Sequence, residues 1–172
     1  MSKTIIITGA SSGIGFALAE YFGKKGNKVY GLSRKVVSSD YFISIPTDIT
    51  EKDQIDNAIS EILKTETRID VLINNAGMGM VGAVEDSTKE DITKLFNLNL
   101  IGSVQMMTAV LPKMREQKSG KIINVSSIGS EMGLPFRGFY SASKSALDKV
   151  TEAMRYEVYP WNIHVCSLHL GD

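Results

Sequence analysis

The chain has 172 residues, of which 43% are hydrophobic and 22% are charged, enough to bury one core of ordinary size. Its 19 basic residues balance its 19 acidic residues, so no excess positive charge is available for a nucleic acid or an anionic lipid surface. We therefore expect no nucleic acid and no membrane among its partners. The one cysteine, Cys166, excludes an intrachain disulfide and suits a reducing compartment, so we expect a cytoplasmic protein.

Short apolar runs alternate with segments of helical period along the chain. The runs that predict strands are 4–7, 28–32, 43–45, 71–73, 121–125 and 163–168. Most lack polar alternation, as expected of strands that are covered on both faces of a parallel sheet. Apolar stripes predict helices around 14–22, 55–63, 92–111 and 142–154. The alternation predicts an α/β fold with a doubly wound parallel sheet in three layers.

The connections between these elements also carry information. Only Ser33 to Asp40 separate the second and third runs, too few for a crossover helix, so we expect a short turn or an irregular segment there. No change in composition marks a boundary, so residues 1–172 are expected to form a single domain. The chain ends directly after the sixth run, and we expect a sheet that is truncated after its sixth strand.

A glycine-rich loop, Thr8-Gly-Ala-Ser-Ser-Gly-Ile-Gly15, leads from the first predicted strand into the first predicted helix. Gly9 suits a tight turn, Gly13 lets backbone amides approach a pyrophosphate, and Gly15 lets the helix pack on the strand. The positive end of the helix dipole would face the anion. The loop alone is also compatible with an ordinary tight turn between a strand and a helix.

Further motifs follow in the order of one family: Asn74-Asn75-Ala76-Gly77, Asn99, Ser127 and Tyr140-x-x-x-Lys144. With the glycine loop they make the chain resemble the classical short-chain dehydrogenase/reductase family, from the first strand to the sixth. The resemblance implies a Rossmann-type fold and hydride transfer between a nicotinamide dinucleotide and a carbonyl or secondary alcohol. Family members continue past a Pro-Gly pair into a substrate loop and a seventh strand. Here Leu170-Gly171 stands at that position, so we expect a fragment or ordered part of a longer chain.

The resemblance also assigns catalytic roles. Tyr140 exchanges a proton with the substrate oxygen, Lys144 holds the nicotinamide ribose and favours the tyrosinate, and Ser127 orients the same oxygen. Tyrosine has an ordinary pKa of about 10 and needs a nearby cation, which a residue four positions along a helix can supply. A solvated surface pair is the alternative for an isolated Tyr-x-x-x-Lys. Ser126 competes with Ser127, but neighbouring strand residues point to opposite faces, and family spacing favours Ser127.

Asn99 and the two histidines complete the catalytic candidates. Asn99 lies in a helical stretch where the family uses an asparagine to hold a helix distortion; otherwise it caps or interrupts the helix. His164 and His169 receive no catalytic role, because neither has a carboxylate or a second histidine at metal-ligand spacing in the sequence. We expect no metal site.

The residues that end the second predicted strand indicate which dinucleotide binds. Folds that prefer NAD place an acidic residue there for the ribose 2′-hydroxyl, whereas an arginine accommodates a 2′-phosphate. No acid is present, and Arg34 and Lys35 follow, so we expect NADP(H) in preference to NAD(H); a solvated basic turn is the alternative. Asp48 matches the family's adenine-contacting aspartate or helps to cap the next helix. The expected cofactor-binding residues are Gly9, Ser11, Ser12, Gly13, Ile14, Gly15, Arg34, Asp48, Asn75, Ala76, Gly77, Tyr140 and Lys144.

The sequence thus predicts an NADP(H)-dependent oxidoreductase that reduces a lipophilic ketone or aldehyde; an acyl-carrier-bound ketone is a second possibility. The apolar residues expected around its site are Met78, Met80, Met132, Leu134, Pro135, Phe136 and Phe139. The alternatives are a catalytically weak NADP(H)-binding regulatory or scaffold protein and a methyltransferase on the same sheet, neither of which needs Tyr140 and Lys144. Because family members commonly pair through two long helices, we expect a homodimer or homotetramer.

Overall fold

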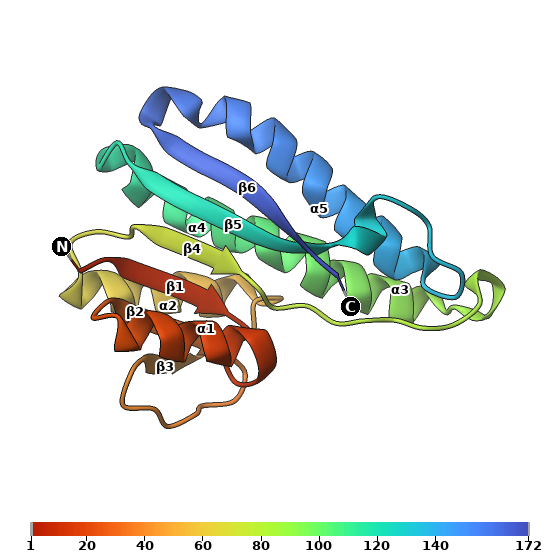
Figure 1. Ribbon diagram of the computed structural model, residues 1–172, viewed down its shortest axis with the longest axis horizontal. Coiled ribbons are helices and arrows are strands. Elements are labelled where there is room, and N and C mark those ends of the chain that lie inside the picture. Colours follow the sequence, from red (N-terminus) through yellow and green to blue (C-terminus); the bar gives the residue numbers. More distant parts are fainter. Residues whose placement is uncertain (1, 172) are drawn as a thin grey trace.

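The computed structural model describes residues 2–171 and shows one parallel sheet with helices packed against it (Figure 1). The strands are β1 (Thr4–Thr8), β2 (Lys28–Ser33), β3 (Ile43–Pro46), β4 (Val71–Asn74), β5 (Gly120–Ser127) and β6 (Ile163–Leu170). The helices are α1 (Gly13–Lys24), α2 (Lys52–Thr65), α3 (Lys89–Phe96), α4 (Ser103–Glu116) and α5 (Gly138–Glu157). The strand order β3-β2-β1-β4-β5-β6 is that of a dinucleotide-binding doubly wound sheet, which confirms the predicted fold class.

The core lies on both faces of this sheet. On one face, α2, α4 and α5 cover fully buried side chains such as Ile6, Leu72 and Ile122. On the other face, α1 covers Ile5 and Ile7 of β1. Figure 1 shows α1 in front of β1 and β2, with α2 and α4 behind the sheet. The three layers hold the carboxyl ends of the strands at one edge.

β6 departs from the expectation that its two faces are both covered. Ile163 and Val165 are buried under α5, whereas His164, Cys166 and Leu168 on the opposite face are exposed. No helix among residues 2–171 lies over that face of β6. The free thiol of Cys166 is therefore exposed.

The segment between β2 and β3 contains no helix, as predicted from its length. Instead, Phe42 is buried and packs edge-on against Phe16 of α1, with ring centroids 5.7 Å apart. Gly31 makes room for this ring, because a Cβ there would lie 2.7 Å from Phe42. The loop is irregular yet fixed to the core by one aromatic anchor.

α3 and α4 form one helical stretch, Lys89–Glu116, that is interrupted by a π-helical turn at Asn97–Gly102. By length and composition alone this stretch could cross a membrane. Met107, Val110 and Met114 of α4 are fully buried against the sheet, which is the behaviour of a core helix. The single apolar stripe predicted for residues 92–111 is thus two helices joined by a distortion.

Candidate functional site

Two adjoining clefts lie at the carboxyl edge of the sheet, beside β1 and β4. These neighbouring strands are the point where the strand order reverses, because the chain continues from β1 toward β2 and from β4 toward β5. The first, the Arg34 cleft, has a volume of about 560 Å³ and follows the ends of β1, β2 and β3. The second, the Tyr140 cleft, has a volume of about 340 Å³ and lies between β4, β5 and the start of α5. Both are lined by Asn75 and Gly77, so together they form one elongated depression.

The glycine loop forms the floor where the two clefts meet. Gly9 has φ +70°, and a Cβ there would lie 2.9 Å from the Cα of Ala76. A Cβ on Gly15 would lie 2.4 Å from the carbonyl oxygen of Gly9, so α1 can pack this closely only with glycine. Gly13, where α1 begins, has φ +55° and open space beside its Cα. These positions fit the roles predicted from the sequence.

The first turn of α1 offers unsatisfied amide groups. Within the described chain, its N-cap residue Ser12 makes no side-chain capping hydrogen bond, and no acidic residue lies in the first turn. The amide groups of such a turn are donors that an anion can satisfy, and the helix dipole adds a favourable potential. The cradle therefore fits a dinucleotide pyrophosphate.

Thr8, the first residue of the glycine-rich motif, has a role that the motif did not predict: it holds the loop after β4 against the glycine loop. Its Oγ1 accepts hydrogen bonds from the backbone amides of Asn75 and Ala76, each at 3.0 Å. Its carbonyl oxygen accepts a hydrogen bond from Nδ2 of Asn75 at 3.0 Å. Thr8 is fully buried, so these bonds fix the wall that the two clefts share.

The basic end of the Arg34 cleft follows β2. Arg34 and Lys35 both line it, together with Asp48. Oδ1 of Asp48 accepts hydrogen bonds from the backbone amide and hydroxyl of Thr50, at 3.0 and 2.8 Å, so it also shapes the turn that enters α2. Both interpretations of Asp48 are thus compatible with its position, while the N-cap residue of α2 is Glu51.

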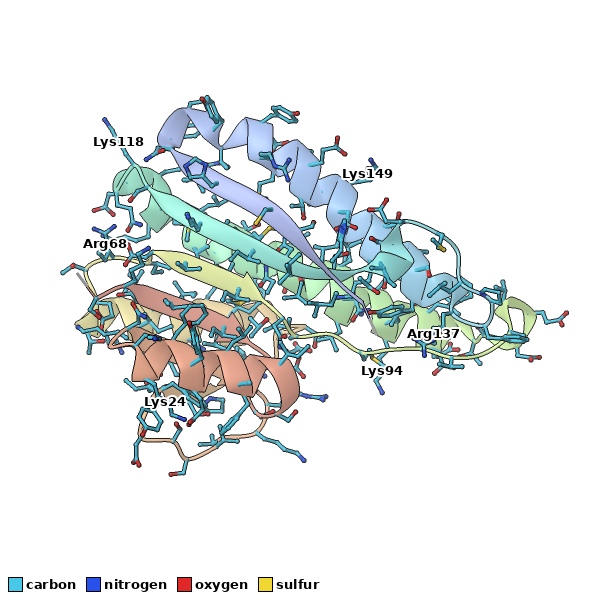
Figure 2. The ribbon with its side chains drawn as sticks, viewed as in Figure 1. Lys24, Arg68, Lys94, Lys118, Arg137 and Lys149 are labelled. Carbon is cyan, nitrogen blue, oxygen red and sulfur yellow. The ribbon has the colours of Figure 1, made fainter. Side chains whose placement is uncertain are left out.

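Lys144 is the most perturbed ionisable residue of the Tyr140 cleft. It is 5% exposed, and its Nζ donates a hydrogen bond to the carbonyl oxygen of Val125 at 2.8 Å. Burial lowers the pKa of Lys144 to about 8, and the carboxylate of Asp148 acts in the opposite direction. Lys149 on the same helix instead points into solvent (Figure 2).

Asn99 lies in the π-helical turn, fully buried behind the cleft. Its Oδ1 accepts from the amide of Met78 at 2.9 Å, and its Nδ2 donates to the Met78 carbonyl at 3.0 Å and to Oγ of Ser143 at 3.1 Å. A Cβ on Gly77 would lie 3.3 Å from Asn99 Oδ1 and 3.4 Å from Lys144 Nζ. The helix distortion that the resemblance implies thus brings Asn99 close to the backbone beside Lys144.

The two serines that end β5 have different partners. Ser127 is half-buried, and its Oγ accepts a hydrogen bond from the amide of Gly129 at 3.1 Å. Ser126 is buried, and its Oγ donates to Oδ2 of Asp148 at 3.0 Å. Both border the Tyr140 cleft. Within residues 2–171 the Ser127 hydroxyl only accepts a hydrogen bond, whereas the Ser126 hydroxyl donates its proton to Asp148.

The outer wall of the Tyr140 cleft combines apolar side chains with one exposed cation. Met78, Met80 and Val81 line it, and so does Arg137, which precedes α5 (Figure 2). The other apolar residues expected here do not line it within residues 2–171: Met132, Leu134, Pro135, Phe136 and Phe139. The chain turns at Phe136, with φ +60°, and leaves that ring 66% exposed.

The structure therefore brings most of the predicted residues to one depression. Those in the Arg34 cleft are Gly9, Ser11, Ser12, Arg34, Asp48, Asn75, Ala76 and Gly77. Those in the Tyr140 cleft are Ile14, Asn75, Gly77, Ser127, Tyr140 and Lys144. Gly13, Gly15 and Asn99 lie outside both linings: Gly15 and Asn99 make the backbone contacts described above, and Gly13 has a positive φ where α1 begins.

His169 has neighbours that the sequence did not reveal. Its Nε2 lies 3.1 Å from Oδ2 of Asp148, and its Nδ1 lies 3.4 Å from Oε1 of Glu131. The sequence offered no signal for this cluster, because its three residues come from separate segments of the chain.

The sequence matches the family described as short chain dehydrogenase over residues 3–172. A 3-ketodihydrosphingosine reductase of Bacteroides thetaiotaomicron is 46% identical over 171 residues, covering 99% of this chain and 64% of that protein. The chain therefore spans less than two thirds of the length of this relative.

Solved structures show the same likeness. The structure of ElxO with NADP bound has a TM-score of 0.94 at 29% identity, and covers 99% of this chain and 74% of that chain. That of NAD+-bound xylitol dehydrogenase has a TM-score of 0.91 at 26% identity, and covers 98% of this chain and 70% of that chain. The match over residues 3–172 shows the family, and the glycine cradle and the buried Lys144 in the cleft of Tyr140 agree with it. The chain belongs to the short-chain dehydrogenase family.

Proposed function

We propose that this protein is an NADP(H)-dependent oxidoreductase that reduces a carbonyl to an alcohol. The observation that carries the proposal is the placement of Lys144, 5% exposed in the same cleft wall as Tyr140 and Ser127. Burying an ammonium that is hydrogen-bonded to a backbone carbonyl destabilises a fold, so such a residue in a cleft indicates chemistry.

The choice of NADP(H) rests on charge at the end of β2. Arg34 and Lys35 line the cleft that the uncapped first turn of α1 adjoins. Asp48, the one acidic residue of that lining, is engaged by Thr50. A 2′-phosphate would meet two cations here, and a free ribose hydroxyl would lack the carboxylate that NAD-preferring folds provide.

Bound NADPH supplies the hydride to the carbonyl carbon, and the residues of the chain manage the oxygen. Ser127 donates a hydrogen bond to the substrate oxygen and orients it in the Tyr140 cleft. The Tyr140 hydroxyl transfers its proton to that oxygen as the alcohol forms. The resulting tyrosinate is stabilised by the ammonium of Lys144, and both residues lie on one face of α5.

A lipophilic substrate class is supported by exposed apolar side chains on the two loops next to the Tyr140 cleft, here called its rim; of these, Val81 lines the cleft itself. Val81, Val84 and Phe136 are 72%, 63% and 66% exposed. The amide of Gly82 donates to the Phe136 carbonyl at 2.8 Å, which joins the two loops that carry this rim. An exposed apolar rim favours a lipophilic ketone or aldehyde over a sugar. The name of the Bacteroides relative, a 3-ketodihydrosphingosine reductase, is that of an enzyme acting on such a ketone.

A panel of carbonyl compounds tests the proposal, using the natural full-length protein and NADPH absorbance. Long-chain ketones should be reduced with a higher kcat/KM than sugars of similar carbonyl reactivity. Val81→Ser should narrow this preference by raising KM for long-chain ketones, because it removes apolar contact area at the mouth. NADPH binding without turnover of any carbonyl would contradict the proposal and support a regulatory or scaffold role.

The surroundings of the protein are part of the same proposal. We infer a cytoplasmic location, supported by the exposed free thiol of Cys166 and by the reduced state of NADP(H) that the reaction uses.

A further inference from the structure

Asp148 is a charged residue near the site that the proposed reaction leaves without a role. It lies on α5, one turn after Lys144, and faces the ends of β5 and β6. Its Oδ2 accepts a hydrogen bond from Ser126 of β5 at 3.0 Å and lies 3.1 Å from Nε2 of His169 of β6. One carboxylate thus connects the helix of Tyr140 and Lys144 with two strand ends.

The first consequence concerns Lys144. Residues four apart on a helix are neighbours, and the carboxylate of Asp148 favours the ammonium form of Lys144 against the effect of burial. Within residues 2–171, Nζ donates to the neutral carbonyl of Val125, the neutral amide of Asn99 lies beyond Gly77, and Tyr140 lines the same cleft. Asp148 thus adds negative charge one helical turn from Lys144 without a direct ion pair, because its carboxylate contacts Ser126 and His169 instead.

Asp148 itself is held in its ionised form. Burial opposes its ionisation, but the hydroxyls of Ser130, Ser167 and Ser126 and the ring of His169 outweigh burial and lower the pKa of this carboxyl. Lys149 and Glu131 are the further charged groups nearby, and Glu131 contacts the opposite side of the His169 ring at 3.4 Å.

The second consequence concerns the end of β6. His169 pairs in register with Ser126, and the next residues, Leu170 and Gly171, form part of the Tyr140 cleft wall. Contacts of His169 and Ser126 with one carboxylate fix this wall relative to α5.

We propose that Asp148 is a positioning residue of the proposed oxidoreductase: its carboxylate places a negative charge one helical turn from Lys144 and, through Ser126 and His169, fixes the end of β6 against α5. The proposal gives roles to Ser126 and His169, which the reaction itself does not use. It predicts two separable effects, one electrostatic and one mechanical.

The electrostatic effect is tested with Asp148→Asn, which keeps the shape and removes the charge. Lysine 13Cε NMR of the cofactor-free protein should show Lys144 titrating at lower pH than in the wild type, because the attraction that favours its ammonium is gone. Asp148→Glu should restore the titration toward that of the wild type. Glu152→Gln is the matched control: it removes a charge one turn further along α5, where Glu152 pairs with Lys149 at the surface.

The mechanical effect is tested with His169→Gln. Hydrogen exchange of the amides at the end of β6 should accelerate, and NADPH affinity should fall on the order of fivefold, or about 1 kcal/mol. The Lys144 titration should stay close to that of the wild type, because Asp148 remains. His164→Gln, an exposed substitution at the opposite end of β6, should change none of these properties.

Either arm can overturn the proposal. An unchanged Lys144 titration in Asp148→Asn contradicts the electrostatic role, and unchanged exchange at the end of β6 in His169→Gln contradicts the mechanical role. The proposed function would instead be contradicted if the wild type did not bind NADPH. The NMR titration and the hydrogen-exchange measurement do not depend on cofactor binding, so they test the role of Asp148 in that case too.

Discussion

Lys144 is buried, and burial disfavours its charged ammonium form, so this residue makes the folded state less stable. Its pKa in the folded protein is about 8, against an ordinary value of 10.5, because burial removes water from the ammonium. At 1.36 kcal/mol per pKa unit, this difference destabilises the folded state by about 3 kcal/mol below pH 8. The unfolded chain binds more protons between these two pKa values, so stability should rise with pH through this range.

Lys144→Met should therefore stabilise the cofactor-free protein at neutral pH. Loss of the hydrogen bond to Val125 offsets about 1 kcal/mol, which leaves a net gain of about 2 kcal/mol. The gain should shrink above pH 8 and become a loss of about 1 kcal/mol above the ordinary lysine pKa, where only the missing hydrogen bond remains. Urea denaturation at several pH values measures it, and a gain that does not vary with pH would contradict this explanation.

Arg34 is expected to determine the preference between the two dinucleotides. Arg34→Asp should weaken NADPH binding roughly 10- to 100-fold, because a charge-assisted hydrogen bond contributes about 1.5–3 kcal/mol, and should strengthen NADH binding. Fluorescence titration with both cofactors measures the effect. Lys25→Gln, which removes an exposed cation outside the cleft, should leave both affinities unchanged. Equal affinities of the unmodified protein for the two cofactors would contradict the assignment.

At the scale of elements, α1 packs closely against the loop after β4 because residue 15 is a glycine, which has a hydrogen in place of a side chain. A Cβ at Gly15 would lie 2.4 Å from the carbonyl oxygen of Gly9 and 2.5 Å from Nδ2 of Asn75. Relieving the first contact would require a shift of the backbone. Gly15→Ala should lower the free energy of unfolding by about 1–3 kcal/mol, as overpacking does, and weaken NADPH binding. Gly79→Ala has no atom within 4 Å of the added Cβ and serves as the control. Equal stability of the two variants in thermal unfolding would refute the packing argument.

The elements differ in how far the sequence specifies them. The strands were predictable because buried parallel strands are continuous apolar runs; the run at 71–73 became β4, Val71–Asn74. The π-helical turn at Asn97–Gly102 leaves no break in the apolar stripe, so only the family resemblance implied it. The roles of Thr8 and Asp148 were missed because their partners, such as Asn75 and His169, are distant in the sequence. Phe136 was expected at the site from its position alone, but the backbone turn directs it to the rim.

At the scale of the whole molecule, we predict self-association. The π-helical turn before α4 carries an exposed Ile101, and the end of α5 carries Tyr156 with Tyr159 just beyond it, each at least 45% exposed. Apolar and aromatic groups on helix surfaces are typical of interfaces between subunits. Light scattering of the natural full-length protein should give the mass of a homodimer or homotetramer. A monomer at every concentration used for activity would contradict this prediction.

At the scale of the whole molecule, the glycine cradle and Tyr140, the proposed proton donor, lie in two adjoining clefts of one depression. Tyr140→Phe removes one hydroxyl and leaves the ring and the cradle in place. Carbonyl reduction should fall by at least about 100-fold, since a positioned acid contributes roughly 10²–10⁴-fold in rate, while the Kd for NADPH should stay within a few-fold of the wild type. Turnover close to that of the wild type in Tyr140→Phe would contradict the account.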